Sequence, residues 1–175
     1  VVCVDDGSSD SSARIAEACG AIVHRHRANR GYGGALKSLF KKARELDADA
    51  MIILDSDGQH EPSDIPTLLE PILAQKADFV IGSRFVEGGA GEDMPVYRRL
   101  GIKVISAASN LSSDLDIKDT QSGFRAFSKL AIDRLRFDAE GMELSLEMLE
   151  DAHVKELVIK EVPTIIRYDV PKGSN

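Results

Sequence analysis

Two short apolar runs that each end in a pair of aspartates constrain the fold of this chain more than any other feature. Residues 1–4 are followed directly by two aspartates, and residues 51–54 are followed by Asp55 and Asp57. Apolar runs of this length, bounded by turn residues, are typical of buried strands in a parallel sheet. Ligands of open α/β sheets bind where the carboxyl ends of the strands meet. The sequence therefore predicts two carboxylate clusters at one crevice.

Strand-like and helix-like patterns alternate along the rest of the chain. Strands are predicted at residues 1–4, 21–26, 51–54, 79–82, 124–127 and 157–167, and helices at residues 10–19, 33–46, 62–75, 96–111, 129–135 and 142–152. The first helix is expected to turn Ile15, Ala16, Ala18 and Cys19 inward, and the second Leu36, Leu39, Phe40 and Ala43. Repeated strand-helix units predict an α/β domain with a mostly parallel central sheet covered on both faces.

Length and charge narrow the class of protein. The chain has 175 residues, of which 43% are hydrophobic, so one domain over residues 1–175 is expected. The formal net charge of −7 argues against nucleic acid as a main partner. Two cysteines give no disulfide framework, and no run of about 20 apolar residues predicts a membrane span. The segment opens inside a strand without methionine, so we expect it to be truncated at both ends.

The turn Asp55-Ser56-Asp57-Gly58-Gln59 follows the central predicted strand. Such a turn brings both carboxylates to one cation, because Gly58 permits the backbone angles that the turn needs. Few, hard oxygen ligands suit Mg²⁺ or Mn²⁺, with phosphates completing the coordination shell. An acidic, solvated turn is the alternative. An EF-hand loop fits poorly, because its glycine belongs at the sixth position and this one stands at the fourth.

Two further loops are candidates for binding a nucleotide. In Asp5-Asp6-Gly7-Ser8-Ser9, a carboxylate directly after a strand is placed to accept hydrogen bonds from ribose hydroxyls or a base N–H, although the same residues are ordinary turn and cap chemistry. Asn29-Arg30-Gly31-Tyr32-Gly33-Gly34 leads into a helix whose free N–H groups favour an anion. The second loop is not a P-loop, because no Gly-Lys-Ser/Thr follows. The histidines show no metal-ligand spacing.

Six motifs stand in an order that resembles the family 2 glycosyltransferases with the GT-A (nucleotide-diphospho-sugar transferase) fold, most closely the branch of dolichol-phosphate mannose synthases and polyprenyl-phosphate glycosyltransferases. They are Val4-Asp5-Asp6-Gly7-Ser8, Asn29-Arg30-Gly31, Leu54-Asp55-Ser56-Asp57-Gly58-Gln59-His60, Gly82-Ser83-Arg84-Phe85, Asp119-Thr120-Gln121-Ser122-Gly123-Phe124-Arg125 and Glu161-Val162-Pro163. Each motif alone is weak, but six in family order are specific.

The resemblance implies roles for named residues. It places the metal and the donor diphosphate on Asp55, Asp57 and Gln59. It places the nucleotide-sugar near Asp5 or Asp6, Asn29, Gly31, Asp55, Arg167 and Lys172. It places the acceptor phosphate near Arg84, Arg98 or Arg99, and Ser106, with Lys103 and Arg125 as further neighbours. The residues expected to take part in catalysis are Asp55, Asp57, Arg84 and Asp119.

The reaction implied is an inverting transfer of a hexose from GDP-mannose or UDP-glucose to a dolichyl or undecaprenyl phosphate, with Mg²⁺ or Mn²⁺ at the leaving diphosphate. A phosphate acceptor is already anionic near neutral pH, so arginines that position it matter more than a base. Asp119 is expected to shape the sugar pocket, serve as a base or simply cap its own turn. The lipid acceptor implies work in the cytoplasm at the face of a membrane, with any membrane anchor in the missing flanks.

Relatives in this family begin with a further strand that ends in a Pro-x-Tyr-Asn-Glu turn and grips the nucleotide base. That element would precede Val1 and is absent from this sequence. A central strand and part of the donor pocket are therefore expected to be missing. The segment is then expected to bind donor poorly, or to fold only with a completing strand.

Three other readings of the same residues stay open. A strand ending in Asp-x-Asp-Gly also opens haloacid-dehalogenase-like phosphatases, but Gln59 stands where threonine is usual, and the motif is central instead of first. A non-catalytic module that only binds nucleotide-sugars would use the same two loops. A sugar nucleotidyltransferase would need a glycine-rich start with arginine and lysine, which this sequence lacks.

Overall fold

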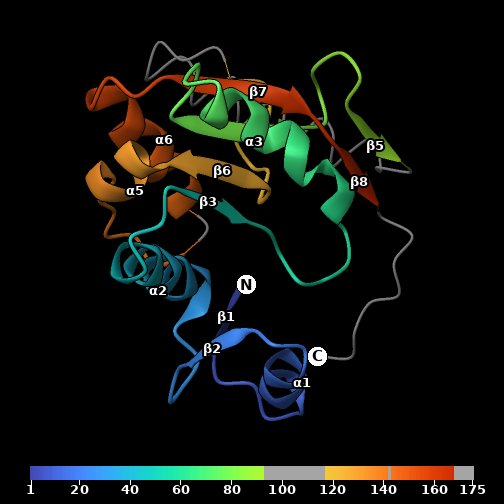
Figure 1. Ribbon diagram of the computed structural model, residues 1–175, viewed down its shortest axis with the longest axis vertical. Coiled ribbons are helices and arrows are strands. Elements are labelled where there is room, and N and C mark those ends of the chain that lie inside the picture. The colour runs from blue at the N-terminus through green and yellow to red at the C-terminus, as the bar shows by residue number, and fades with distance from the viewer. Residues whose placement is uncertain (93–116, 142, 168–175) are drawn as a thin grey trace.

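The structure, a computed structural model, describes residues 1–92, 117–141 and 143–167 (Figure 1). The strands are β1 (Val2–Asp5), β2 (Ile22–Arg25), β3 (Ala50–Ile53), β4 (Phe79–Ser83), β5 (Ala90–Glu92), β6 (Arg125–Ser128), β7 (Ile159–Pro163) and β8 (Ile165–Arg167). The helices are α1 (Ser12–Ala18), α2 (Gly31–Glu45), the 3₁₀ turn η1 (Pro62–Asp64), α3 (Ile65–Leu73), α5 (Lys129–Arg134) and α6 (Leu144–Val154).

The strands form three sheets in the described part of the chain. The main sheet has the order β3-β6-β4-β7, β1 pairs with β2, and β5 pairs with β8. Three of the five strand pairings are parallel, but β6 runs antiparallel to both β3 and β4. The prediction of a mostly parallel central sheet is confirmed, because β3, β4 and β7 run in the same direction, and β6 is the antiparallel exception among the described strands of this sheet. The loop before β6 contacts the ends of β3 and β4, so the chain enters β6 at that edge and must run in the opposite direction.

Helices cover both faces of the main sheet. Phe79 and Ile81 of β4 point into a core shared with α2, α5 and α6, whereas Val80 points into a smaller core with Leu68 of α3. All five residues of β4 are buried, as expected for a strand covered on both faces. Phe40 of α2 contacts the ring of Phe127 at 5.0 Å between centroids. Hydrophobic packing thus fixes α2 on the main sheet.

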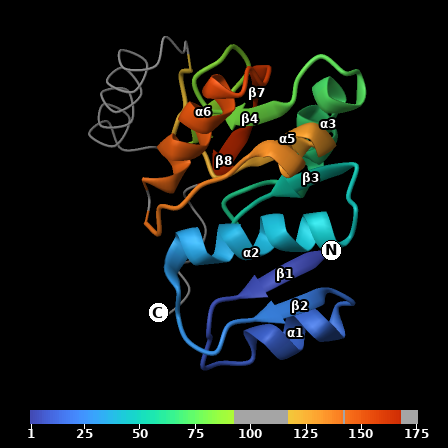
Figure 2. The same ribbon diagram turned by 90° about the vertical axis from the view of Figure 1, so that its left-hand side faces the viewer.

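The main sheet and the β1-β2 sheet are separate, and the edges of β1 and β3 face a cavity. In Figure 2, α2 lies between the two sheets, with β1 and β2 on one side and β3 on the other. Among the described residues, β1 has no strand partner opposite β2, and β3 has none opposite β6. A cavity of about 360 Å³ lies between β1 and β3, lined by residues 1–4, by Tyr32 and Leu36 of α2 and by Ile53 at the end of β3. These two strands therefore each present an open edge to the cavity.

Most predicted helices are confirmed, and one predicted face is wrong. Leu36, Phe40 and Ala43 of α2 are buried as expected. In α1, however, Ala13 is the buried residue, and Ile15 is 61% exposed. This helix packs mainly on β1 and β2, and this small sheet covers too little of its surface to bury the expected side chains. The predicted helix 96–111 lies outside the described residues.

The other differences between the predicted and the observed strands are small. The predicted strand 157–167 divides into β7 and β8 at Thr164, and the glycine-rich loop before residue 95 contains the short strand β5. None of the helices in the described ranges is both long and apolar enough to cross a bilayer.

Helix α3 offers a matched test of this packing. Leu68 is 0% exposed and Leu73, at the end of the same helix, is 72% exposed. We expect Leu68→Ala to lower the free energy of unfolding by about 2–5 kcal/mol, because it leaves a cavity against β4, and Leu73→Ala to change it by less than about 0.5 kcal/mol. Urea unfolding of the two variants checks this prediction, and equal losses would contradict the placement of α3.

Candidate functional site

The turn after β3 presents the first pair of candidate residues. The Asp55 side chain is 53% exposed, and its Oδ2 lies 4.0 Å from Nε2 of His60. The Asp57 carboxylate accepts a hydrogen bond of 3.0 Å from the backbone N–H of Gln59, and Gly58 has a φ of +79°. The turn therefore has the conformation for which glycine is suited, and it holds both carboxylates at the carboxyl end of β3.

The loop before β6 lies directly against Asp55. A Cβ atom added at Gly123 would lie 2.7 Å from Asp55 Oδ2 and 3.6 Å from His60 Nε2, so only glycine fits there without displacing the carboxylate. Asp55 and Gly123 also line the cavity between β1 and β3. The structure thus brings together two motifs that are far apart in the sequence.

The electrostatics around Asp55 favour a bound cation. Partial burial raises the pKa of Asp55, and the charge of Asp57 raises it further against the opposing effect of His60. Burial lowers the pKa of His60, whose ring packs on Phe124 and whose Nδ1 has no hydrogen-bond partner in the described structure. A lowered pKa disfavours the charged imidazole that would compensate the two carboxylates. A divalent ion would compensate them, and carboxylate oxygens are the ligands that Mg²⁺ and Mn²⁺ prefer.

The residues of the chain alone make an incomplete metal site. Within residues 1–92, 117–141 and 143–167, no three histidine, cysteine or acidic side chains gather closely enough to hold an ion. Asp55, Asp57 and the Gln59 amide fit a site that takes its remaining ligands from a phosphorylated molecule. The backbone N–H of Arg167, at the end of β8, donates a hydrogen bond of 3.0 Å to the carbonyl of Gln59, so β8 reaches this turn.

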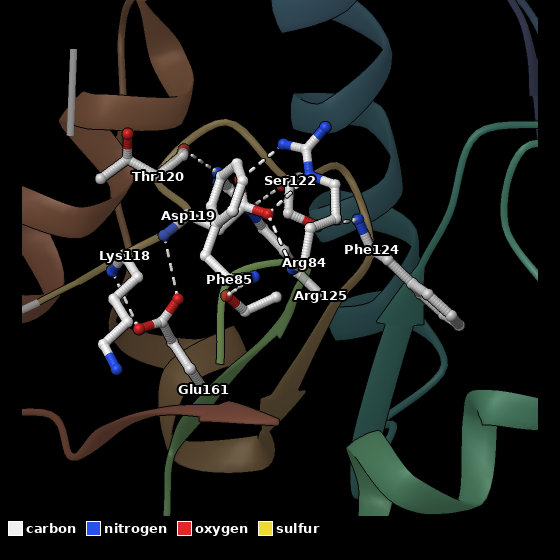
Figure 3. Close-up of polar contacts among 10 residues, drawn as sticks. Arg84, Phe85, Lys118, Asp119, Thr120, Ser122, Phe124, Arg125 and Glu161 are labelled. Carbon is white, nitrogen blue, oxygen red and sulfur yellow. Dashed lines mark hydrogen bonds and ion pairs between the residues drawn. The ribbon is translucent and has the colours of Figure 1, made fainter. Parts of the chain in front are cut away.

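Arg84 and Asp119 form a buried ion pair at the end of β4 (Figure 3). Arg84 Nε donates to Asp119 Oδ2 at 2.7 Å, and Nη2 donates to Oδ1 at 2.5 Å. Asp119 is fully buried, and Glu161 of β7 accepts hydrogen bonds from the backbone N–H groups of Lys118 and Asp119. Because both Asp119 oxygens accept hydrogen bonds from Arg84, this geometry favours an orienting role for Asp119 over the role of base.

Arg125 is a fully buried cation that shapes the same loop. Its Nε donates to the carbonyl of Ser122 at 2.7 Å, and its Nη2 donates to the carbonyl of Thr120 at 2.8 Å (Figure 3). Its Nη1 reaches Ser145 and Met148 of α6 at longer range. Burial lowers the pKa of Arg125. The sequence named Arg125 only as a neighbour of the acceptor, whereas the structure shows that it supports the loop.

The second acidic pair lies at the end of β1 and has protein partners. Asp5 is 5% exposed, accepts a hydrogen bond from the Ser8 N–H and pairs with Arg25 at 3.0 Å. Asp6 accepts hydrogen bonds of 2.8 Å from the N–H groups of Arg30 and Gly31. The anion at the start of α2 is therefore the carboxylate of Asp6 itself. Direct contact of a nucleotide with Asp5 or Asp6 stays a prediction, as it does for Asn29 and Gly31.

Both carboxylates of this pair have a lowered pKa. Hydrogen bonding from Ser8 lowers the pKa of Asp5 most, with a further contribution from Arg25. Burial acts to raise the pKa of Asp6, but hydrogen bonds from His26 and from the N–H groups of Arg30 and Gly31 outweigh it. A depressed pKa stabilises the folded state above the ordinary value of 3.8, and this contribution is lost as the pH falls through the folded value.

Several predicted residues lie outside the described structure. They are Arg98, Arg99, Lys103 and Ser106 for the acceptor, and Lys172 for the donor. Other residues at the site were not predicted, among them Gly123 and Glu161, although both belong to motifs noted in the sequence. Their motif membership was the only signal, because their partners are distant in the chain.

A family model and solved structures match this arrangement. Solved chains of glucosyl-3-phosphoglycerate synthase from Mycobacterium tuberculosis share the fold; one, crystallised with Mn²⁺, UDP-glucose and phosphoglyceric acid, aligns with a TM-score of 0.71 at 21% identity over 99% of this chain and 60% of that chain. The fold is the GT-A fold of glycosyltransferases. The family model described as glycosyl transferase family 2 matches residues 1–136. The chain belongs to glycosyl transferase family 2.

Similar proteins include two from archaea. Uncharacterized protein MJ1222 of Methanocaldococcus jannaschii is 37% identical over 100% of this chain and 74% of its own length. UDP-N-acetylglucosamine–dolichyl-phosphate N-acetylglucosaminyltransferase of Methanococcus voltae is 34% identical over 100% of this chain and 78% of its own length. The chain thus spans about three quarters of these relatives and three fifths of the solved chain. The family assignment leaves the phosphatase alternative without support.

The buried arginine of the loop gives a test of this architecture. We expect Arg125→Met to lower the free energy of unfolding by about 3 kcal/mol or more, because the carbonyls of Thr120 and Ser122 lose their hydrogen-bond donor in a buried environment. Arg134→Met, on the exposed side of α5, is the matched control and should change it by less than about 0.5 kcal/mol. Urea unfolding measures both, and similar values for the two variants would show that Arg125 does not support the loop.

Proposed function

We propose that this chain is the catalytic domain of a metal-dependent, inverting glycosyltransferase that moves a hexose from a nucleotide-sugar to a polyprenyl phosphate. The observation that carries the proposal is the meeting of three elements at one edge of the main sheet: the Asp55 turn, the Gly123 loop and the paired Arg84. Together they offer a cation site beside an oriented guanidinium. The relative from Methanococcus voltae, whose name specifies a UDP-sugar and dolichyl phosphate, supports the same reaction class.

The donor half of the proposed site is the turn after β3. Asp55, Asp57 and Gln59 would hold Mg²⁺ or Mn²⁺ together with the diphosphate of the donor. When bound, the ion stabilises the negative charge that develops on the departing diphosphate. The chain itself contributes the carboxylate of Asp55 at the rim of the cavity, and Gly123 leaves room for Asp55 to keep its position.

The acceptor half is the guanidinium of Arg84. A phosphate monoester is anionic near neutral pH, so the reaction needs a group that places its oxygen and does not need one that removes a proton. A guanidinium held by two hydrogen bonds to Asp119 presents a fixed geometry to a phosphate. Arg98, Arg99 and Ser106 are proposed to complete this pocket.

The lipid acceptor would bring the protein to a membrane surface. The donor is soluble and the polyprenyl tail is not, so transfer takes place where the two meet. We therefore place the enzyme at the cytoplasmic face of a membrane, with GDP-mannose, UDP-glucose and the UDP-N-acetylglucosamine of the Methanococcus voltae relative as the donors to compare.

The binding-only module is the second candidate. It would bind a nucleotide-sugar with Mn²⁺ in the same cavity and yield no product with any acceptor. Mixing each of the three donors with polyprenyl phosphate and Mn²⁺, and separating glycolipid from free sugar, tells the two apart. Nucleotide-sugar binding without glycolipid from any donor would favour the module.

The metal turn gives a sharp kinetic test. We expect Asp55→Asn to reduce glycolipid formation by about 100-fold or more, because the ion that stabilises the leaving diphosphate loses a charged ligand. Asp49→Asn, an exposed aspartate just before β3, removes the same charge at the opposite end of the strand and should leave the rate within about twofold. The rates are measured across an Mn²⁺ titration. Equal activity of wild type and Asp55→Asn at every Mn²⁺ concentration would refute the metal assignment.

The role of Arg84 predicts a selective kinetic effect. Lysine keeps the charge but cannot form two parallel hydrogen bonds, so we expect Arg84→Lys to raise the KM for polyprenyl phosphate by about tenfold and the KM for donor by less than about twofold. Arg134→Lys on α5 serves as the control, and unfolding midpoints confirm that the variants are folded. A rise of equal size in both KM values would count against acceptor positioning.

A further inference from the structure

The side chains of Asp6, His26 and Ser38 form a continuous hydrogen-bonded chain that begins at the second acidic pair. His26 Nδ1 lies 2.6 Å from Asp6 Oδ1, and His26 Nε2 lies 2.7 Å from the hydroxyl of Ser38. The residues come from the end of β1, the segment after β2 and the middle of α2. His26 is 6% exposed and Ser38 is 9% exposed. The imidazole is therefore held at both ring nitrogens between the small sheet and α2.

The direction of these hydrogen bonds follows from the chemistry of the groups. An ionised carboxylate only accepts, so Nδ1 of His26 donates to Asp6. In the neutral ring Nε2 then accepts the hydroxyl proton of Ser38. The order serine, histidine, aspartate is that of a hydrolase triad, but the Ser38 oxygen is buried inside a helix, where no substrate reaches it. The cluster orients groups and does not attack them.

Asp6 transmits this arrangement to the loop that starts α2. Its carboxylate accepts hydrogen bonds from Arg30 and Gly31 as well as from His26. A Cβ atom at Gly7 would lie 2.9 Å from the backbone nitrogen of Asn29, so the turn after β1 packs directly on this loop. Tyr32, which directly follows Gly31 in α2, lines the same cavity as Asp55. A shift of Asp6 would therefore move the rim of the proposed donor site.

We propose that His26, held by Ser38, is a positioning residue that fixes Asp6 and the loop of residues 29–31 in the conformation that receives the nucleotide of the donor. This inference rests on the proposed function. A group that pre-organises a binding loop lowers the cost of ordering that loop when ligand binds. Loss of His26 therefore weakens donor binding and leaves the acceptor KM and the kcat at saturating donor unchanged.

Two substitutions at the same position separate positioning from simple packing. Asparagine places an amide nitrogen near the site of Nδ1 and retains the hydrogen bond to Asp6, whereas glutamine places its amide near Nε2 and retains only the bond to Ser38. We expect His26→Gln to weaken the binding of UDP or GDP with Mn²⁺ by about tenfold or more, and His26→Asn by less than about threefold. His153→Gln, an exposed histidine of α6, is the matched control and should bind as the wild type does.

Binding is measured by calorimetry, and amide hydrogen exchange is measured on the ligand-free protein. His26→Gln should speed the exchange of the Arg30 and Gly31 amides, and His26→Asn should not. Equal exchange in the two variants, or equal nucleotide affinity, would overturn the inference, because a merely space-filling histidine does not distinguish them. If the wild type binds neither UDP nor GDP, the proposed function is wrong, and the exchange of these amides alone then decides the positioning role.

Discussion

The hydrogen bonds from the buried guanidinium of Arg125 to the carbonyls of Thr120 and Ser122 hold the loop on which the rest of the site depends. A buried cation without a carboxylate in contact is costly, and here carbonyl dipoles supply the compensation. The loop they shape carries Asp119 on one side and Gly123 on the other. Asp119 pairs with Arg84, and Gly123 leaves room for the carboxylate of Asp55. One buried side chain thus aligns the cation site with the guanidinium.

The direction of β6 follows from the same loop. The chain must reach the carboxyl ends of both β3 and β4 to place Asp119 and Gly123. From there it continues between those two strands toward their amino ends. An antiparallel strand in the centre of the main sheet is the consequence. Its side chains still alternate between the two cores, because strand periodicity does not depend on direction. The position of the loop at the site therefore also determines the direction of β6 in the main sheet.

Much of this architecture is visible in the sequence, and the remainder is not, for physical reasons. Apolar runs and helix periodicity identify most strands and helices, since they depend on neighbours within about ten residues. The acidic turns are recognisable because they follow such runs. The pairing of Arg84 with Asp119 and the contact of Gly123 with Asp55 join distant segments, and no local pattern encodes them. The burial of Arg125 is not encoded locally either, because an arginine is usually exposed and the burial of its charge depends on carbonyls that only the folded loop presents.

Helix α2 connects the two halves of the proposed donor site. Ser38 stands about 200° around the helix from Leu36, since each residue advances about 100°. One face of α2 therefore packs Leu36 and Phe40 into the core of the main sheet, while the other holds His26 beneath the small sheet. The N–H of Gly31 in the first turn of the same helix donates a hydrogen bond to Asp6. Tyr32 lines the cavity that Asp55 also lines. The described structure pairs no strand of the small sheet with one of the main sheet, so the relative position of the two acidic clusters is set largely by this helix. Apolar packing fixes its distance from the main sheet, and the hydrogen bonds of His26 set its orientation toward the small one.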